Sequence, residues 1–157
     1  MSLFSNIADF QRKLADLPLA KYEAGEVVLT AGSITGRLLI LKEGAVDVVK
    51  DDVKIGEVTT LGAVFGELSV LLDRPHTADV VAVKPSQFYV ANAAGPFMRD
   101  PVVLLYIAAV LAGRLDRANK AVVHLKSQIE DGESSLVIGK TLRTIERALG
   151  VGGASLH

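Results

Sequence analysis

Short runs rich in β-branched residues, punctuated by glycine, dominate the chain between Tyr22 and Asn92. The runs occupy 26–29, 37–41, 45–49, 53–58, 78–83 and 87–91. Their length and close spacing are typical of strands, and they favour a β-sandwich or jelly-roll barrel over a parallel sheet. The turns between them contain residues that tolerate positive φ, which tight reversals need. These are Gly25, Gly32, Gly36, Gly44, Gly56, Gly62 and Gly66, with Asp51-Asp52 in a further hairpin turn.

Helical periodicity flanks this region and appears once within it. Apolar residues at helical spacing predict a short amphipathic helix over 3–15, which packs on the main domain, and a long helix from Pro96 to about Glu130. The stretch 66–72 contains good helix formers and is ended by Asp73-Arg74-Pro75, so a short helix interrupts the strands. A last helical pattern covers 134–149.

The predicted fold class is therefore α+β and mainly β. It is a jelly-roll β-barrel with a short N-terminal helix, an inserted helix and a long C-terminal helix. The expected segments are 1–18 for the N-terminal helix, 19–95 for the barrel, 96–131 for the long helix, and 132–157 for a short helix and tail.

The long helix has an apolar heptad pattern with alternating spacings of four and three. Its positions are Leu104, Ala108, Leu111, Leu115, Ala118, Val122, Leu125 and Ile129. One interpretation is that this face packs on the chain's own barrel, and the broader apolar face around Ile107 and Val110 fits that. Beyond Leu115 only a narrow apolar stripe remains, which favours a coiled-coil homodimer. The basic residues nearby, Arg114, Arg117, Lys120 and Lys126, are mixed with acids and are interpreted as a solvated face.

Composition and charge narrow the function. Half of the 157 residues are hydrophobic and 22% are charged, which is typical of a folded globular chain. Seventeen basic and 18 acidic residues leave a net charge of −1, so nucleic acid is not an expected partner. The first 14 residues lack the apolar region of a signal peptide, and the longest apolar run, 102–112, is too short to span a bilayer. With no cysteine, the expected location is the cytoplasm, without membrane contact.

Catalytic and metal chemistry lack the necessary residues. The three histidines are His76, His124 and His157, and no two of them have the spacing of metal ligands. Ser69 follows Gly66-Glu67-Leu68, which is not the elbow of a serine hydrolase. The sequence thus predicts no enzyme, no metal and no cofactor.

One segment has the pattern of an anion site. In 62–69 a glycine turn opens into the short helix, where backbone N–H groups and a close-approach glycine favour a phosphate. Glu67 in the first turn is suited to a sugar hydroxyl. Acids are also common in first turns because they match the helix dipole, so Glu67 alone does not decide between the two.

The surrounding motifs carry a resemblance to a known family. They are Y-x-x-G-E at 22–26, Gly32, L-L-I-L-x-x-G at 38–44, F-G-E-L at 65–68 and D-R-P-H-T-A-D-V at 73–80. From about Tyr22 to Asn119 the chain resembles the cyclic-nucleotide-binding domain of bacterial cAMP-receptor-type regulators, cyclic-nucleotide-gated channels and cyclic-nucleotide-dependent kinases. The segment 65–80 looks like the family's phosphate-binding cassette, so the inserted helix is a cassette helix.

The resemblance implies a ligand and a set of contacts. The ligand would be cAMP or cGMP, with Gly66 and the following N–H groups on the phosphate, Glu67 on the ribose 2′-hydroxyl and Thr77 on phosphate or purine. The implied ligand-binding set is Phe65, Gly66, Glu67, Leu68, Ser69, Arg74, His76 and Thr77.

Two features depart from the family pattern. His76 replaces the cassette arginine that pairs with the phosphate, and a histidine of ordinary pKa is mostly neutral at pH 7 and lacks the arginine fork. Only 27 residues follow Glu130, too few for the winged helix-turn-helix of the transcription regulators.

The prediction is a non-catalytic regulatory domain that signals to an unknown effector protein through its C-terminal helix, without its own DNA-binding domain. The alternative is a degenerate fold that binds no nucleotide and serves as a dimeric interaction module.

Overall fold

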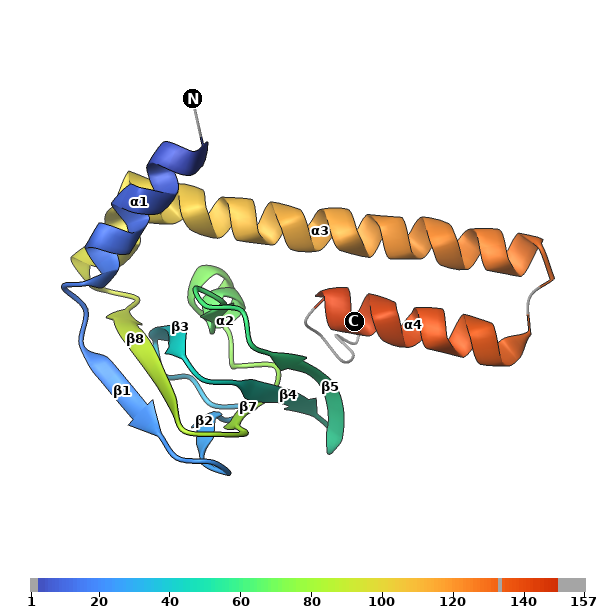
Figure 1. Ribbon diagram of the computed structural model, residues 1–157, viewed down its shortest axis with the longest axis horizontal. Coiled ribbons are helices and arrows are strands. Elements are labelled where there is room, and N and C mark those ends of the chain that lie inside the picture. The colour runs from blue at the N-terminus through green and yellow to red at the C-terminus, as the bar shows by residue number, and fades with distance from the viewer. Residues whose placement is uncertain (1–2, 133, 150–157) are drawn as a thin grey trace.

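Two four-stranded antiparallel sheets form the centre of the molecule. The computed structural model describes residues 3–132 and 134–149 (Figure 1). One sheet has the order β1-β8-β3-β6 and the other β2-β7-β4-β5. The strands are β1 (Leu19–Tyr22), β2 (Val27–Leu29), β3 (Arg37–Glu43), β4 (Val46–Lys50), β5 (Val53–Val58), β6 (Val64–Phe65), β7 (Asp79–Ala82) and β8 (Ser86–Asn92). The predicted α+β, mainly β, jelly-roll architecture is confirmed.

Each predicted strand run overlaps an observed strand, and the turns follow the expected chemistry with one exception. Asp51 and Asp52 have φ of 48° and 62° and join β4 to β5. Six of the seven turn glycines have positive φ, whereas Gly56 lies inside β5 opposite Val48. Strands β1 and β6 were not predicted, because β1 is short with only alternate partial burial and β6 has two residues.

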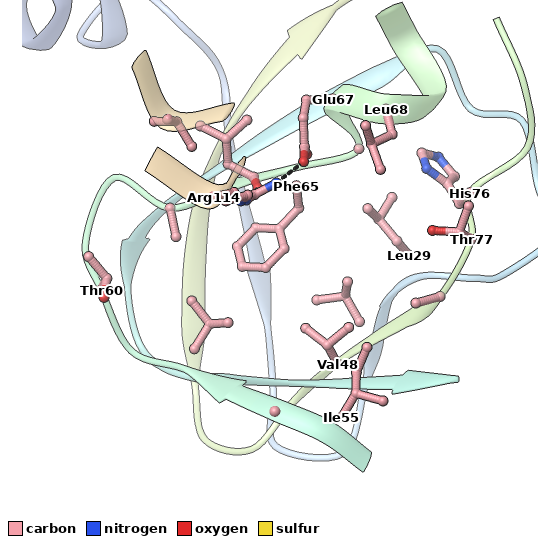
Figure 2. Close-up of a pocket in the computed structure, with 18 of the residues that line it drawn as sticks. Leu29, Val48, Ile55, Thr60, Phe65, Glu67, Leu68, His76, Thr77 and Arg114 are labelled. Atoms are coloured by element: carbon pink, nitrogen blue, oxygen red, sulfur yellow. Dashed lines mark hydrogen bonds and ion pairs between the residues drawn. The ribbon is translucent and has the colours of Figure 1, made fainter. Parts of the chain in front are cut away.

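The helix α2 (Glu67–Leu72) interrupts the strands between β6 and β7, as predicted. It begins after Gly66 and ends at Asp73, whose left-handed φ of 50° stops the helix. Figure 2 shows Glu67 and Leu68 at its start. The chain from β6 into this helix is the part of the barrel that the cassette resemblance singled out.

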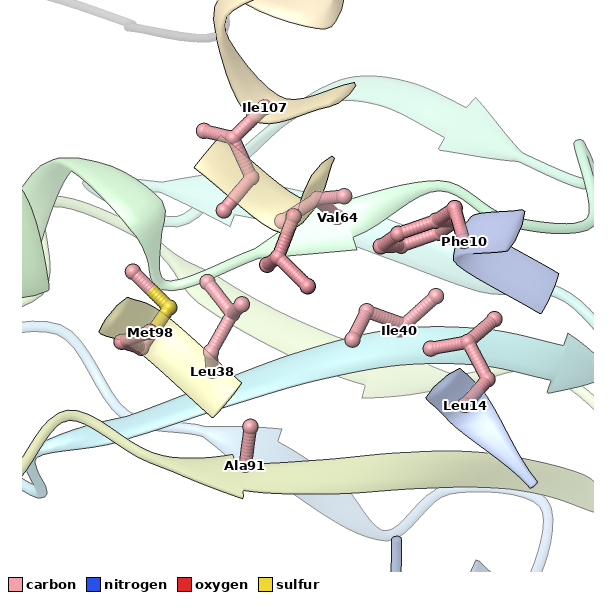
Figure 3. Close-up of a cluster of buried hydrophobic side chains, with 9 residues drawn as sticks. Phe10, Leu14, Leu38, Ile40, Val64, Ala91, Met98 and Ile107 are labelled. Atoms are coloured by element: carbon pink, nitrogen blue, oxygen red, sulfur yellow. The ribbon is translucent and has the colours of Figure 1, made fainter. Parts of the chain in front are cut away.

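Strand β3 is buried on both faces and separates two hydrophobic clusters. Leu39 and Leu41 point into the space between the sheets, whereas Leu38 and Ile40 point outward, because side chains alternate along a strand. All four are at most 1% exposed. Figure 3 shows the outward cluster, which the helices α1 (Leu3–Leu14) and α3 (Pro101–Glu130) cover. Its buried members are Phe10, Leu14, Leu38, Ile40, Val64, Ala91, Met98, Val103 and Ile107.

The long helix begins later than the sequence predicted. Pro96–Arg99 form a single 3₁₀ turn, η1, and α3 starts at Pro101 after Asp100 caps it by accepting from the Val102 N–H at 2.9 Å. Asp100 also pairs with Lys13 of α1, which fixes the N-terminal helix to the start of α3. The predicted packing of the N-terminal helix on the main domain is confirmed.

Part of the heptad pattern of α3 is covered within the chain itself, as expected if the first half of the helix packs on the barrel. Leu111 packs against the outward cluster, and Ala118 is only 3% exposed. The helix α4 (Ser135–Leu149) runs back alongside the second half of α3 (Figure 1), and the hydroxyl of its buried Thr141 donates to the Gln128 side chain. The exposed members of the pattern are Leu104, Ala108, Leu115, Val122 and Ile129.

The described residues contain neither a helix that could cross a membrane nor a cluster of side chains that could hold a metal. Over 3–132 and 134–149, none of the helices combines the length and apolar character needed to cross a bilayer. The same residues contain no group of three or more histidine, aspartate or glutamate side chains arranged to hold a metal. His157 lies outside the described residues.

Candidate ligand-binding cavity

A cavity of about 950 Å³ lies between the cassette, the second sheet and one face of α3. Its floor is apolar and includes Leu29, Val48, Ile55 and Phe65 (Figure 2). Its rim is polar, with side chains from the cassette on one wall and from α3 on the other. An apolar floor below a polar rim is suited to a ligand with an apolar ring and a polar or charged group.

Gly66 lets the backbone turn sharply at the cassette. Its φ is 84°, and a Cβ there would lie 2.6 Å from the Arg37 carbonyl oxygen. Any side chain at this position would therefore be strained and would also collide with β3. The glycine keeps the first turn of α2 directly at the cavity, where the sequence placed the anion site.

Glu67 is the buried charge of the cavity, and its partner comes from α3. The residue is 5% exposed, and the Arg114 guanidinium pairs with its Oε1 (Figure 2). The second guanidinium nitrogen, Nη2, donates to the Val64 carbonyl oxygen at 3.0 Å. The interpretation of Arg114 as part of a solvated face was wrong, because the sequence pattern of α3 does not reveal that its partner lies 47 residues earlier.

His76 lies on the cassette side of the cavity, away from Arg114 (Figure 2), and hydrogen bonds hold both its ring and its backbone. It is 6% exposed, and its ring Nε2 shares a hydrogen bond of 2.8 Å with the Thr35 hydroxyl. Its backbone N–H donates to the Ser33 carbonyl oxygen at 2.9 Å. Burial lowers the pKa of His76 below its ordinary value, and the negative charge of Glu67 opposes this only in part. The expectation of an ordinary pKa is corrected: the pKa of His76 is lowered, which favours the neutral imidazole at pH 7.

The structure brings together seven of the eight residues of the implied ligand-binding set. Those that line the cavity are Phe65, Gly66, Glu67, Leu68, Ser69, His76 and Thr77. Arg74 is the exception, and its place in the set is corrected. Its backbone closes the end of α2 by accepting from the Ser69 hydroxyl, and its side chain does not line the cavity. The cassette wall therefore presents no guanidinium of its own to the cavity within the described residues.

Tyr106 links the cavity to the N-terminal helix. Its hydroxyl donates to the Gly62 carbonyl oxygen at 3.0 Å, and its ring stacks on Phe10 with centroids 3.7 Å apart. Burial raises the pKa of Tyr106, so the phenol keeps its proton and remains a donor. Sequence analysis missed this residue, because a tyrosine in an apolar helix looks like ordinary core.

Comparison with known proteins agrees with this geometry. The family model described as "Cyclic nucleotide-binding domain" matches residues 19–95. The barrel belongs to this family. The matched residues coincide with the barrel boundaries predicted from sequence, and they contain the whole cassette.

Two proteins that are similar to this chain over its barrel are a kinase regulatory subunit and a kinase. The cAMP-dependent protein kinase regulatory subunit of Yarrowia lipolytica is 34% identical over 85 residues, which is 53% of this chain and 22% of that protein. The cGMP-dependent protein kinase of Plasmodium berghei is 31% identical over 86 residues, 52% of this chain and 10% of that protein. The chain thus spans less than a quarter of either relative.

A solved structure extends the likeness to the fold. A cyclic nucleotide-binding domain from Methylobacillus flagellatus KT is similar with a TM-score of 0.60 and 26% identity, over 69% of this chain and 67% of that one.

Proposed function

We propose that this chain is a non-catalytic regulatory domain that binds cAMP or cGMP in the cavity and signals through α3. The observation that carries this is the pair between Glu67 and Arg114, because it joins the cassette directly to the long helix. Glu67 offers the sugar a carboxylate that is already held in place by a cation. The first turn of α2 offers N–H groups to the cyclic phosphate, and Phe65 and Ile55 offer the base an apolar surface.

Binding at Glu67 alters the contacts of α3. A ribose hydroxyl that donates to this carboxylate competes with or reorients the Arg114 guanidinium, which also donates to Val64. The two packings of α3 then differ in their affinity for ligand, and occupancy shifts the population between them. An effector protein that binds α3 in only one of the two packings then binds more or less tightly as the ligand shifts the population. We place the protein in the cytoplasm, without a nucleic-acid or membrane partner, as its composition predicts.

Calorimetric titration with cAMP, cGMP and cyclic dinucleotides tests the proposal. A mononucleotide is expected to bind, and Glu67→Gln is expected to weaken it by about tenfold or more, since a charge-assisted hydrogen bond contributes about 1.5–3 kcal/mol. Glu43→Gln is the matched control, because Glu43 is exposed at the end of β3 and does not line the cavity. A folded wild-type chain that binds none of these ligands at millimolar concentration makes the domain a ligand-free interaction module instead.

We also propose that the chain forms a homodimer through the exposed stripe of α3. Leu115, Val122 and Ile129 are 59%, 51% and 57% exposed and follow one another at heptad spacing. The double variant Leu115→Asp and Val122→Asp is expected to be a folded monomer by light scattering, while Lys120→Asp keeps the wild-type assembly. A wild-type chain that is monomeric at tens of micromolar contradicts the dimer.

A further inference from the structure

Most cations that line the cavity are already paired. The Lys54 Nζ lies 2.8 Å from Asp47 Oδ1 and 3.4 Å from Glu57 Oε2. The Arg114 guanidinium pairs with the Glu67 carboxylate. His76 is neutral and bonded to Thr35. Arg117 also lines the cavity, and within 3–132 and 134–149 it has neither a hydrogen bond nor an ion pair. This leaves one guanidinium with all five of its N–H donors available to a ligand.

The position of Arg117 relates it to a particular part of the ligand. It lies three residues beyond Arg114, which is about 4.5 Å along the helix and on the same side. The proposed function places the sugar at Glu67, so Arg114 marks the sugar end of the α3 wall. We place the base over the apolar floor formed by Val48 and Ile55 (Figure 2), in the same cavity that Arg117 lines.

A guanidinium distinguishes purines by their 6-substituent. Guanine and hypoxanthine present two acceptors, O6 and N7, which match the arginine fork. Adenine presents the N7 acceptor beside a 6-amino donor, which repels a second N–H. We infer that Arg117 makes this site select a 6-oxopurine cyclic nucleotide, such as cGMP, over cAMP. The inference rests on the proposed function and specifies its ligand.

Titration with three nucleotides tests this selection. Wild type is expected to bind cGMP and cyclic inosine monophosphate about tenfold more tightly than cAMP, the lower part of the range for a bidentate contact, because Arg117 is exposed. Cyclic inosine monophosphate lacks the 2-amino group, so its agreement with cGMP assigns the preference to O6 and N7. Replacement of N7 by carbon in 7-deaza-cGMP is expected to remove part of the preference.

Variants assign the preference to the residue. Arg117→Leu is expected to bind all three nucleotides with similar affinity, because the loss is larger for the two 6-oxopurine nucleotides than for cAMP, which a purely structural role would not produce. Arg117→Lys keeps the charge without the fork and is expected to lose most of the preference. Lys120→Leu is the matched control, since Lys120 lies one turn further on α3, pairs with Asp116 and does not line the cavity.

The outcomes separate the two proposals. Equal wild-type affinity for the three nucleotides, or a preference that survives in Arg117→Leu, overturns the role of Arg117 and leaves the proposed function standing. Failure of every nucleotide to bind the folded wild type overturns the proposed function and this inference together.

Discussion

The two walls of the cavity are held in place by different kinds of contact. The cassette wall is held through the backbone: Gly66 has left-handed φ, the Gly32 N–H donates to the His76 carbonyl oxygen at 2.8 Å, and the His76 N–H donates to Ser33. The α3 wall is held through side chains, by the Tyr106 hydroxyl on Gly62 and the Arg114 guanidinium on Val64 and Glu67.

This difference indicates which wall responds to a ligand. Backbone hydrogen bonds and left-handed turns are formed by the fold itself, and a ligand does not compete for them without unfolding the loop. Side-chain contacts to a carbonyl or a carboxylate are ones that a sugar hydroxyl or a phosphate can replace. Under the proposed function, we therefore expect the cassette to stay fixed and α3 to be the element whose packing changes.

The largest expected effect comes from disturbing the fixed wall at Gly66. Gly66→Ala adds left-handed strain and a collision with the Arg37 carbonyl oxygen, and is expected to cost about 3 kcal/mol of unfolding free energy and to abolish nucleotide binding. Gly25→Ala is the control, because Gly25 has a similar φ of 88° with nothing within 4 Å of the added Cβ. It is expected to cost about 1 kcal/mol. Equal costs in urea denaturation would mean that the close approach to β3 contributes nothing.

A second prediction adds the missing cation to the fixed wall. His76→Arg is expected to tighten cyclic-nucleotide binding by about 1.5–3 kcal/mol, because an arginine pairs with the phosphate through a charged fork. Calorimetry measures the change, and His124→Arg on the exposed side of α3 is the control. Unchanged affinity in a folded His76→Arg would place the phosphate away from this residue.

Acidity is expected to imitate this substitution in wild type. The phosphate favours the protonated imidazole, so the pKa of His76 is higher in the complex than in the free protein, where burial lowers it. Binding then takes up a proton, so affinity rises as the pH falls from neutral toward the lowered pKa of His76 in the free protein. The His76→Arg variant is expected to show little pH dependence over the same range. The neighbouring charges, Glu67 and its partner Arg114, are present in both proteins.

The smallest effect is expected on the responsive wall. Tyr106→Phe removes the hydrogen bond to Gly62 while keeping the ring stack on Phe10, and is expected to cost about 1 kcal/mol of unfolding free energy. It also loosens α3 at the cavity, which hydrogen exchange of the Gly62–Val64 segment should report. Tyr22→Phe is the control, since the Tyr22 ring packs on Phe88 at the far side of the barrel. If Tyr22→Phe lowers the unfolding free energy as much as Tyr106→Phe does, the hydrogen bond from Tyr106 to Gly62 does not stabilise the packing of α3.

The parts of this structure that sequence predicted are those encoded locally. Strand runs such as 37–41, the Asp51-Asp52 turn and the cassette motif each depend on neighbouring residues and on backbone conformations that few residue types adopt. A two-residue strand such as β6 has no local pattern, because its pairing to β3 determines its existence.

The parts that sequence missed depend on contacts between distant segments. Arg114 has the same helical surroundings as Lys120, yet one is paired with Glu67 across the cavity and the other with Asp116 on its own helix. The heptad pattern was real, but periodicity does not say which neighbour covers a face. Ala118 is buried and Leu115 is exposed, although both fit the same repeat.

The position of the outward cluster has a consequence for where the domain can be cut. The family match covers 19–95, yet five of the nine buried residues in that cluster lie outside it. They are Phe10, Leu14, Met98, Val103 and Ile107. A segment trimmed to the family boundaries would expose Leu38, Ile40 and Val64, which are at most 1% exposed in the intact chain. The segment that matches the family is thus smaller than the segment needed for a complete hydrophobic core. A chimaera or reporter built from this barrel has to include α1 and the first turns of α3.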